Sequence, residues 1–205
     1  MSLKLVAGLG NPGAEYERTP HNVGFRVVNR VAELASASWR DDPKFKGSVS
    51  RIRFQGADAL LLKPLTYMNL SGEAVGKLAH YFGVVPADIV VVSDDADLPV
   101  GRLRIRPAGG SGGHRGLQSV IDVCGTNAFA RVRVGIGRSA FGGSLADFVL
   151  SRPAPEEEEV LRRAVSAAAE AVMCVLTRGT DEAMNRFNGE SATAAEKPKQ
   201  EEQRG

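Results

Sequence analysis

The stretch Ile89-Val90-Val91-Val92-Ser93-Asp94-Asp95-Ala96-Asp97 decides the fold of this chain. It begins with four β-branched residues in a row, which is typical of a central strand that is buried on both faces. It ends in three carboxylates. Because ligands of α/β proteins bind beyond the carboxyl ends of the strands, we expect a functional site at this end of the strand.

Strand and helix patterns alternate on either side of this strand. Further strands are predicted at residues 3–9, 49–54, 59–62, 102–106 and 131–136, and the second and third of these form a hairpin through residues 55–58. Helices are predicted from residue 19 onward, over 74–82, after the glycine-rich loop 109–116, from 155 to 179 and over 181–187. The alternation predicts an α/β fold, and the hairpin makes its sheet mixed.

Length and composition indicate one domain. The chain has 205 residues, of which 43% are hydrophobic, enough for one substantial core. We expect a single domain over residues 1–187 and a disordered polar tail over 188–205, where no large apolar residue occurs. No apolar run reaches the roughly 18 to 20 residues that span a bilayer. The N-terminus shows no signal-peptide pattern, so we expect a soluble, cytoplasmic protein without membrane contact.

Common cofactor and metal motifs are not supported. Residues 8–13 match the dinucleotide pattern G-x-G-x-x-G, but Pro12-Gly13 forms a turn and helical periodicity begins only near residue 19. The loop 109–116 lacks the Gly-Lys-Ser/Thr of a phosphate-binding P-loop. The three histidines show no ligand spacing with Cys124 and Cys174, the only cysteines. We therefore expect neither cofactor nor metal, and no disulfide.

His21 is the candidate for acid–base chemistry. A helix that starts at Thr19 places it in the first turn, where the positive end of the helix dipole disfavours the imidazolium form. A neutral imidazole can accept a proton, although a histidine here could also serve only to cap the helix. Asn11, Asn69 and the three carboxylates of residues 94–97 follow strands or precede helices near the same sheet edge. Any of those carboxylates could orient the imidazole, and spacing alone does not choose among them.

Positive charge concentrates in one segment, although the whole chain carries only +2. Residues 98–140 contain seven arginines, and Asp122 is the one acidic residue among them. Strand periodicity predicts that Arg102, Arg104 and Arg106 share one face, and that Arg131 and Arg133 share one face. A solvated sheet face would explain this pattern, but the use of arginine alone near a glycine loop favours contact with phosphates.

Four blocks of this sequence together resemble one family, the bacterial-type peptidyl-tRNA hydrolases. The blocks are GNPGAEYERTPHNVG at 10–24, YMNLSG at 67–72, DDADLP at 94–99 and GGSGGHRGL at 109–117. The resemblance extends from Leu3 to about Phe187, with the blocks in the family's order. It implies a mixed, twisted β-sheet flanked by helices, a monomer, and hydrolysis of the ester between peptide and tRNA without a metal.

The resemblance also implies residue roles. His21 matches the family's catalytic base, Asp94 the carboxylate that stabilises it, and Asn11 the position that discriminates N-blocked peptidyl-tRNA from aminoacyl-tRNA. Substrate-binding positions are matched by Tyr16, Tyr67, Met68, Asn69, His114 and Arg115, with His114 in a gating loop, and tRNA phosphate contacts by Arg106 and Arg133.

One departure and two alternatives accompany this prediction. Many members have asparagine where this chain has Arg115, which can donate a hydrogen bond but cannot accept one. One alternative is a non-catalytic RNA-binding protein on the same scaffold, of which the family has splicing-factor relatives. The other is a small-molecule esterase, although no G-x-S-x-G nucleophile motif occurs.

Overall fold

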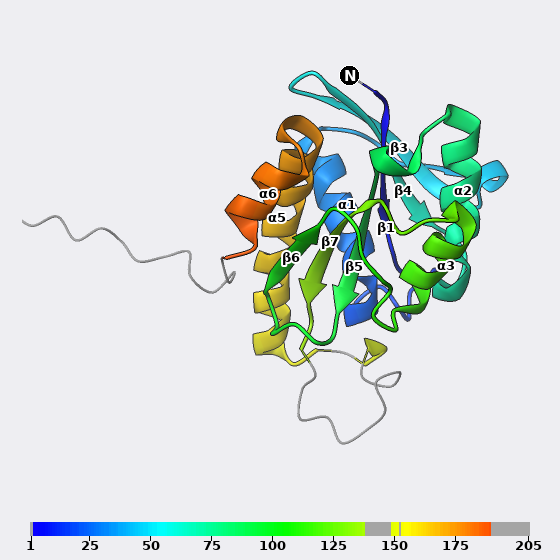
Figure 1. The fold of residues 1–205 in the computed structure, drawn as a ribbon. Helices are drawn as coiled ribbons and strands as arrows, with labels where there is room; N and C mark the ends of the chain where they lie inside the picture. The colour runs from blue at the N-terminus through cyan, green and yellow to red at the C-terminus, as the bar shows by residue number, and fades with distance from the viewer. Residues whose placement is uncertain (1, 138–148, 152, 190–205) are drawn as a thin grey trace, which may run out of the picture.

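A seven-stranded mixed β-sheet lies between two layers of helices in the computed structural model, which describes residues 2–137, 149–151 and 153–189 (Figure 1). The strand order is β2-β3-β4-β1-β5-β7-β6. The strands are β1 (Lys4–Gly8), β2 (Arg40–Asp42), β3 (Gly47–Phe54), β4 (Ala57–Pro64), β5 (Ile89–Asp95), β6 (Leu103–Arg106) and β7 (Ala130–Gly135). The predicted α/β class with a mixed sheet is confirmed.

The helices divide between the two faces of the sheet. One face packs against α1 (Val23–Leu34) and α5 (Pro155–Arg178), with α6 (Thr180–Phe187) against α5 and β6. The other face packs against α2 (Ser71–Phe82) and α3 (Arg115–Cys124), as Figure 1 shows. Each face therefore has its own apolar core, and the sheet separates the two. Within the described residues, no helix has the length and apolarity required to cross a membrane.

The central strand is the one predicted. Every residue of β5 is buried, and β5 pairs in parallel with β1 on one side and β7 on the other. The hairpin is also confirmed, but its strands are longer than predicted because only Gln55 and Gly56 form the turn, both with positive φ. Such a two-residue turn matches the right-handed twist of the paired strands. The short edge strand β2 was not predicted.

The helix predicted from Thr19 begins later. Thr19 does not cap it, because its hydroxyl donates to the carbonyl oxygen of Tyr16. A 3-10 turn spans Pro20–Asn22, and α1 starts at Val23. Gly24 explains this placement: a Cβ there would collide with the backbone of Leu9 and with the carbonyl oxygen of Val92. Glycine thus lets the start of α1 lie against the carboxyl ends of β1 and β5, which brings residue 21 to that edge.

The structure describes only the first two residues of the predicted tail, 188 and 189. Residues 190–205, most of the predicted tail, lie outside the described residues. Asn188, which the prediction assigned to the tail, forms two hydrogen bonds to Ile105 of β6. The packed domain therefore continues at least to Asn188. Arg138, a member of the predicted basic segment, lies outside the described residues.

Candidate active site

A cavity of about 490 Å³ opens beyond the carboxyl ends of β5 and β7. Its lining includes nine of the eleven predicted site residues: Asn11, His21, Tyr67, Met68, Asn69, Asp94, His114, Arg115 and Arg133. Tyr16 and Arg106 are not among the lining residues. Segments separated by more than one hundred residues in the chain thus meet at the edge of the sheet where the sequence predicted a site.

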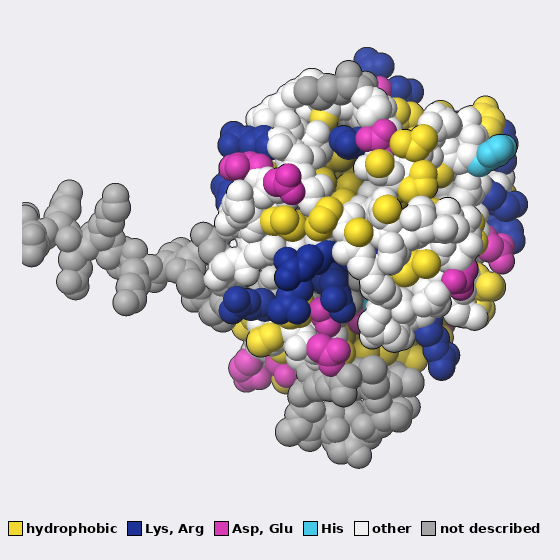
Figure 2. Space-filling model, viewed as in Figure 1, with side chains coloured by type: hydrophobic (Ala, Val, Ile, Leu, Met, Phe, Trp, Pro, Cys, Tyr) yellow, Lys and Arg dark blue, Asp and Glu magenta, His cyan; other side chains and the backbone are white. Residues whose placement is uncertain are grey.

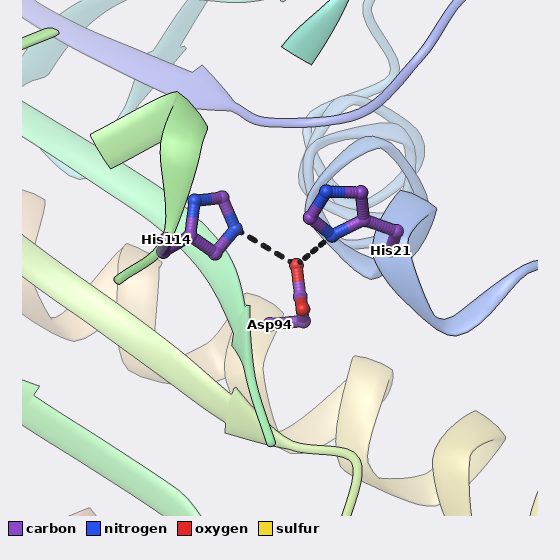
Figure 3. Close-up of side chains that lie close together, drawn as sticks. All are labelled: His21, Asp94 and His114. Carbon is purple, nitrogen blue, oxygen red and sulfur yellow. Dashed lines mark hydrogen bonds and ion pairs between the residues drawn. The ribbon is translucent and has the colours of Figure 1, made fainter. Parts of the chain in front are cut away.

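Asp94 lines this cavity and lies between two histidines (Figure 3). Its Oδ1 is 2.8 Å from Nδ1 of His21 and 2.9 Å from Nε2 of His114. The carboxylate is 4% exposed, at the end of the buried strand β5. Of the three carboxylates left open by spacing, Asp94 is therefore the one that contacts His21.

The protonation of His114 follows from its position at the start of α3. Its Nδ1 accepts hydrogen bonds from the backbone N–H groups of Gly116 and Leu117, at 3.1 and 3.2 Å, and so caps the helix. A nitrogen that accepts cannot carry a proton, so the proton of a neutral His114 is on Nε2. Nε2–H then donates to Asp94. Sequence reasoning assigned His114 to a gating loop and missed this role.

Asp94 is ionised at neutral pH. Burial, the strongest single influence, raises the pKa of this carboxyl, but the charge and hydrogen bonds of His114 and His21 outweigh it and hold the pKa well below its usual range. An ionised carboxylate only accepts hydrogen bonds, so Nδ1 of His21 must donate to it. The lone pair of a neutral His21 is then on Nε2, the ring nitrogen not bonded to Asp94.

The same three side chains have the spacing of a metal site. Nδ1 of His21, Oδ1 of Asp94 and Nε2 of His114 all lie within 4.8 Å of one another. This set contains an aspartate and no cysteine, so histidine–cysteine spacing in the sequence gave no signal of it. Both nitrogens hydrogen-bond the carboxylate directly, so a cation could enter only by displacing both protons. The observed contacts are hydrogen bonds that join all three side chains.

Asn11 is held rigidly at the cavity wall. The side chain of Asn22 accepts from the backbone N–H of Asn11 at 2.8 Å and donates to its carbonyl oxygen at 2.9 Å. The Asn11 Oδ1 accepts from the backbone N–H of Met68 at 2.8 Å. No hydrogen bond joins Nδ2 of Asn11 to the described residues, so this donor is available to a ligand. Asn22 was not predicted, and its place beside His21 in the first block was the only signal.

Tyr67 and Asn69 lie at the rim of the cavity around the 3-10 turn Met68–Leu70. The Tyr67 side chain is 62% exposed, so it is not part of the core. Met68 is buried and packs beneath the start of α3, where a Cβ on Gly116 would collide with its sulfur. Tyr67 and Asn69 are thus accessible to a ligand, whereas Met68 mainly supports the cavity wall.

Arginines occupy one face of the paired strands β6 and β7. Arg104 lies opposite Arg133 and Arg106 opposite Arg131, and the space-filling view shows the dark-blue cluster over these strands (Figure 2). Arg104 and Arg106 are exposed on the same face, as predicted, because Leu103 and Ile105 point into the core. Like charges directly opposite each other destabilise a sheet, so the pattern is unfavourable for stability alone.

The prediction that Arg131 contributes to a phosphate-binding face is wrong. Its side chain is 1% exposed, and its guanidinium donates to the carbonyl oxygens of Gly109, Gly110 and Asn127. Burial and the neighbouring charge of Arg133 lower its pKa. Strand periodicity gave the correct face, but the glycine loop covers this part of it. Arg131 anchors that loop.

Arg133 and Asp95 form the link between the arginine face and the cavity. Nε of Arg133 lies 3.1 Å from Oδ2 of Asp95, and Oδ1 of Asp95 accepts from the backbone N–H of Asp97. Asp95 therefore orients a cation, whereas Asp94 orients His21. Arg133 and Gly112 both line the cavity, and a terminal guanidinium nitrogen of Arg133 lies next to Gly112.

Comparisons with known proteins agree with this arrangement. A family model described as peptidyl-tRNA hydrolase matches residues 5–197. Peptidyl-tRNA hydrolases of Gloeobacter violaceus and Desulforudis audaxviator are 44% and 47% identical to this chain, over 93% and 91% of it and 96% and 93% of their own length. The crystal structure of the peptidyl-tRNA hydrolase from Acinetobacter baumannii is similar with a TM-score of 0.86 and 35% identity, over 93% of this chain and 96% of that one.

Proposed function

Because this chain belongs to the peptidyl-tRNA hydrolase family and is thus an enzyme that hydrolyses peptidyl-tRNA, we propose that His21 is the general base of the reaction. The observation that carries the proposal is the shared carboxylate: Asp94 accepts from both histidines. That arrangement leaves Nε2 of His21 as the basic nitrogen. It lies in a cavity with room for the ester and a water molecule.

The reaction then proceeds by proton transfer through one nitrogen. Water donates a proton to Nε2 of His21 as its oxygen attacks the ester carbonyl carbon. Asp94 stabilises the resulting imidazolium ion, because its negative charge lies 2.8 Å from Nδ1. The tetrahedral intermediate collapses with cleavage of the bond to the ribose oxygen, which takes the proton back from Nε2. The products are the free peptide and tRNA with its terminal hydroxyl restored.

Asn11 supplies a fixed donor for the peptide part of the substrate. Its Oδ1 is occupied by the backbone N–H of Met68, so the side-chain amide cannot rotate without losing that bond. The free Nδ2 is thereby pre-oriented for a carbonyl oxygen, either of the ester or of the peptide. Asn69 and Tyr67 at the rim contact the chain beyond. An N-blocked substrate offers a peptide carbonyl there that an aminoacyl-tRNA lacks.

The arginine face binds the acceptor stem and the 3′ end of the tRNA. Arg104 and Arg106 are exposed and form no ion pair with any described residue, so their charges are available to phosphates. Arg133, at the cavity wall, contacts the phosphates nearest the ester. Arg115 donates hydrogen bonds to the substrate, although it cannot accept one as the asparagine of many relatives could. All these groups belong to one chain, which supports action as a monomer, and we expect it in the cytoplasm, where translation produces the substrate.

Two other functions are less well supported. A protein that only binds RNA has no need for a carboxylate bonded to two histidines. An esterase for small molecules has no need for the arginine face on β6 and β7. Turnover of N-acetyl-aminoacyl-tRNA, compared with unblocked aminoacyl-tRNA and a simple ester, separates the three.

The test of the base is the variant His21→Ala with N-acetyl-aminoacyl-tRNA as substrate. Positioned base catalysis contributes roughly 10² to 10⁴ in rate, so we expect kcat to fall by about that factor. The matched control is His80→Ala, because His80 is exposed on α2 and lies outside the cavity. If His21→Ala turned over at the rate of the His80 variant, the proposal would be wrong.

A further inference from the structure

β6 is an edge strand with one unusual partner. It has four residues and, among the described strands, pairs only with β7. On its open side, the side-chain amide of Asn188 hydrogen-bonds both backbone groups of Ile105. Oδ1 accepts from the N–H at 2.6 Å, and Nδ2 donates to the carbonyl oxygen at 3.2 Å. A single side chain thus replaces the neighbouring strand that this edge lacks.

Asn188 is held in place by the helix that precedes it. It follows α6, and its backbone N–H donates to the carbonyl oxygen of Met184 at 3.1 Å. Phe187 and Ala183 of α6 are buried in the core that also contains Leu103 and Ile105. The amide is therefore fixed by the packing of α6 and not by a free chain end.

The strand that Asn188 secures carries the two exposed arginines. Arg104 and Arg106 flank Ile105 and point to the opposite face from it. They lie opposite Arg133 and Arg131, so four positive charges repel one another across this strand pair. The Ile105 carbonyl oxygen also accepts a long hydrogen bond from Arg106 itself, at 3.5 Å. A four-residue edge strand under this repulsion needs a restraint on its open side.

We propose that Asn188 is a positioning residue for tRNA binding: by closing the open edge of β6, it holds Arg104 and Arg106 in the orientation that contacts phosphates. The inference rests on the proposed function of the arginine face. It assigns a role to the end of α6, which lies outside the cavity and touches no substrate. Loss of the amide leaves the Ile105 N–H without its partner and its carbonyl oxygen with only the 3.5 Å hydrogen bond from Arg106, so the strand frays and the two charges spread over more conformations.

The experiment compares Asn188→Ala with Asn185→Ala, because Asn185 is exposed on the same helix. With deacylated tRNA as the probe, we expect Asn188→Ala to raise Kd about three- to tenfold and to lessen its dependence on salt. KM for N-acetyl-aminoacyl-tRNA should rise similarly, with kcat little changed. The amide proton of Ile105 should exchange faster with solvent. The Asn185 variant should change none of these quantities.

A second variant distinguishes loss of the hydrogen bonds to Ile105 from a general disturbance of α6. Asn188→Asp keeps the acceptor for the Ile105 N–H but sets an oxygen against the Ile105 carbonyl oxygen, so an effect at least as large is expected without shortening the side chain. The double variant Arg104→Ala/Arg106→Ala distinguishes the role of Asn188 from that of the arginine face. If it binds tRNA like the wild type, the proposed role of the arginine face fails. Suppose instead that the double variant binds tRNA weakly. The positioning role is then overturned if both Asn188 variants bind tRNA normally. It is also overturned if the Asn188 variants bind tRNA weakly while the amide proton of Ile105 exchanges at the wild-type rate.

Discussion

The cleft around Asp94 and the arginine face of β6 and β7 differ in how their charged groups are paired. In the cleft, one buried carboxylate receives two N–H donors, and each histidine nitrogen bonded to it has a defined proton. On the arginine face, four guanidinium groups lie on two paired strands, and the two exposed ones, of Arg104 and Arg106, form no ion pair with the described residues. Satisfied polar groups fix geometry, whereas unsatisfied charge attracts a polyanion. The comparison predicts that substitutions in the cleft lower kcat and those on the arginine face raise KM.

The largest effect is expected from Asp94→Asn. The carboxamide keeps the shape but loses the negative charge that stabilises the imidazolium ion of His21. We expect kcat for N-acetyl-aminoacyl-tRNA to fall by roughly 10² to 10⁴. The comparison variant is Asp95→Asn, one residue along the strand, which should act mainly on KM through Arg133. Equal losses of kcat in the two variants would break the distinction between cleft and arginine face.

Replacement of Arg131 should affect stability more than affinity. Arg131→Met leaves the carbonyl oxygens of Gly109, Gly110 and Asn127 without a buried donor. The loss of such hydrogen bonds costs about 1–3 kcal/mol each, partly recovered by relaxation of the loop, so we expect about 3 kcal/mol less free energy of unfolding by urea denaturation. If Arg131→Met instead lost tRNA affinity, with the same salt dependence as the replacement of an exposed arginine, Arg131 would be a phosphate-binding residue.

Arg106→Ala and Arg133→Ala should raise KM about tenfold each, because each removes a positive charge that pairs with a phosphate. The slope of log KM against log salt should become shallower by about 0.7 to 1 for each phosphate that is no longer neutralised. Measurement at several salt concentrations distinguishes this from a general loss of structure. The exposed Arg30, ion-paired with Glu33 on α1, offers the control Arg30→Ala, for which no change is expected.

A smaller effect concerns pH and stability. The pKa of Asp94 in the folded protein is held below its unfolded value of about 3.9, so the ionised carboxylate stabilises the folded state at any pH above that value. This contribution disappears as the pH falls through the window between the two pKa values. The free energy of unfolding should therefore fall more steeply for the wild type than for Asp94→Asn as the pH drops below about 4, so that the difference between the two proteins shrinks there. A difference that widened as the pH fell below about 4 would show that the sign is wrong.

The smallest expected effect is that of metal removal. If the His21–Asp94–His114 set is a proton network, treatment with EDTA and dialysis should leave kcat unchanged. Added Zn²⁺ should inhibit, since the ion would compete with the two protons for nitrogens that lie within 4.8 Å of the carboxylate oxygen. Loss of activity with EDTA that Zn²⁺ restores would identify a metal site instead.

The sequence predicted those features that depend on short-range pattern. The β-branched run of β5, the hairpin around Gln55-Gly56 and the start of α5 at Pro155 each follow from residues within a few positions of one another. The edge of the sheet at which the site forms followed from the position of the carboxylates. The grouping of His21 with Asp94 in particular came from the family resemblance, because spacing left three acids open.

Tertiary contacts decided the rest. The 3-10 turn before α1 depends on Gly24 meeting backbone from β1 and β5, which no local pattern reports. Period-two alternation placed Arg131 and Arg133 on one face but could not show that the glycine loop buries Arg131. His114 likewise has two partners, the amides of α3 and the carboxylate of β5, and only the second belongs to the cleft.

The proton positions of the two histidines test the central claim most directly. Nitrogen NMR of ¹⁵N-labelled protein near neutral pH reports which ring nitrogen of each histidine carries hydrogen. We predict hydrogen on Nδ1 of His21 and on Nε2 of His114, with Nε2 of His21 unprotonated and ready to accept from water. A neutral His21 with its hydrogen on Nε2, or one protonated on both nitrogens, would contradict its role as the base.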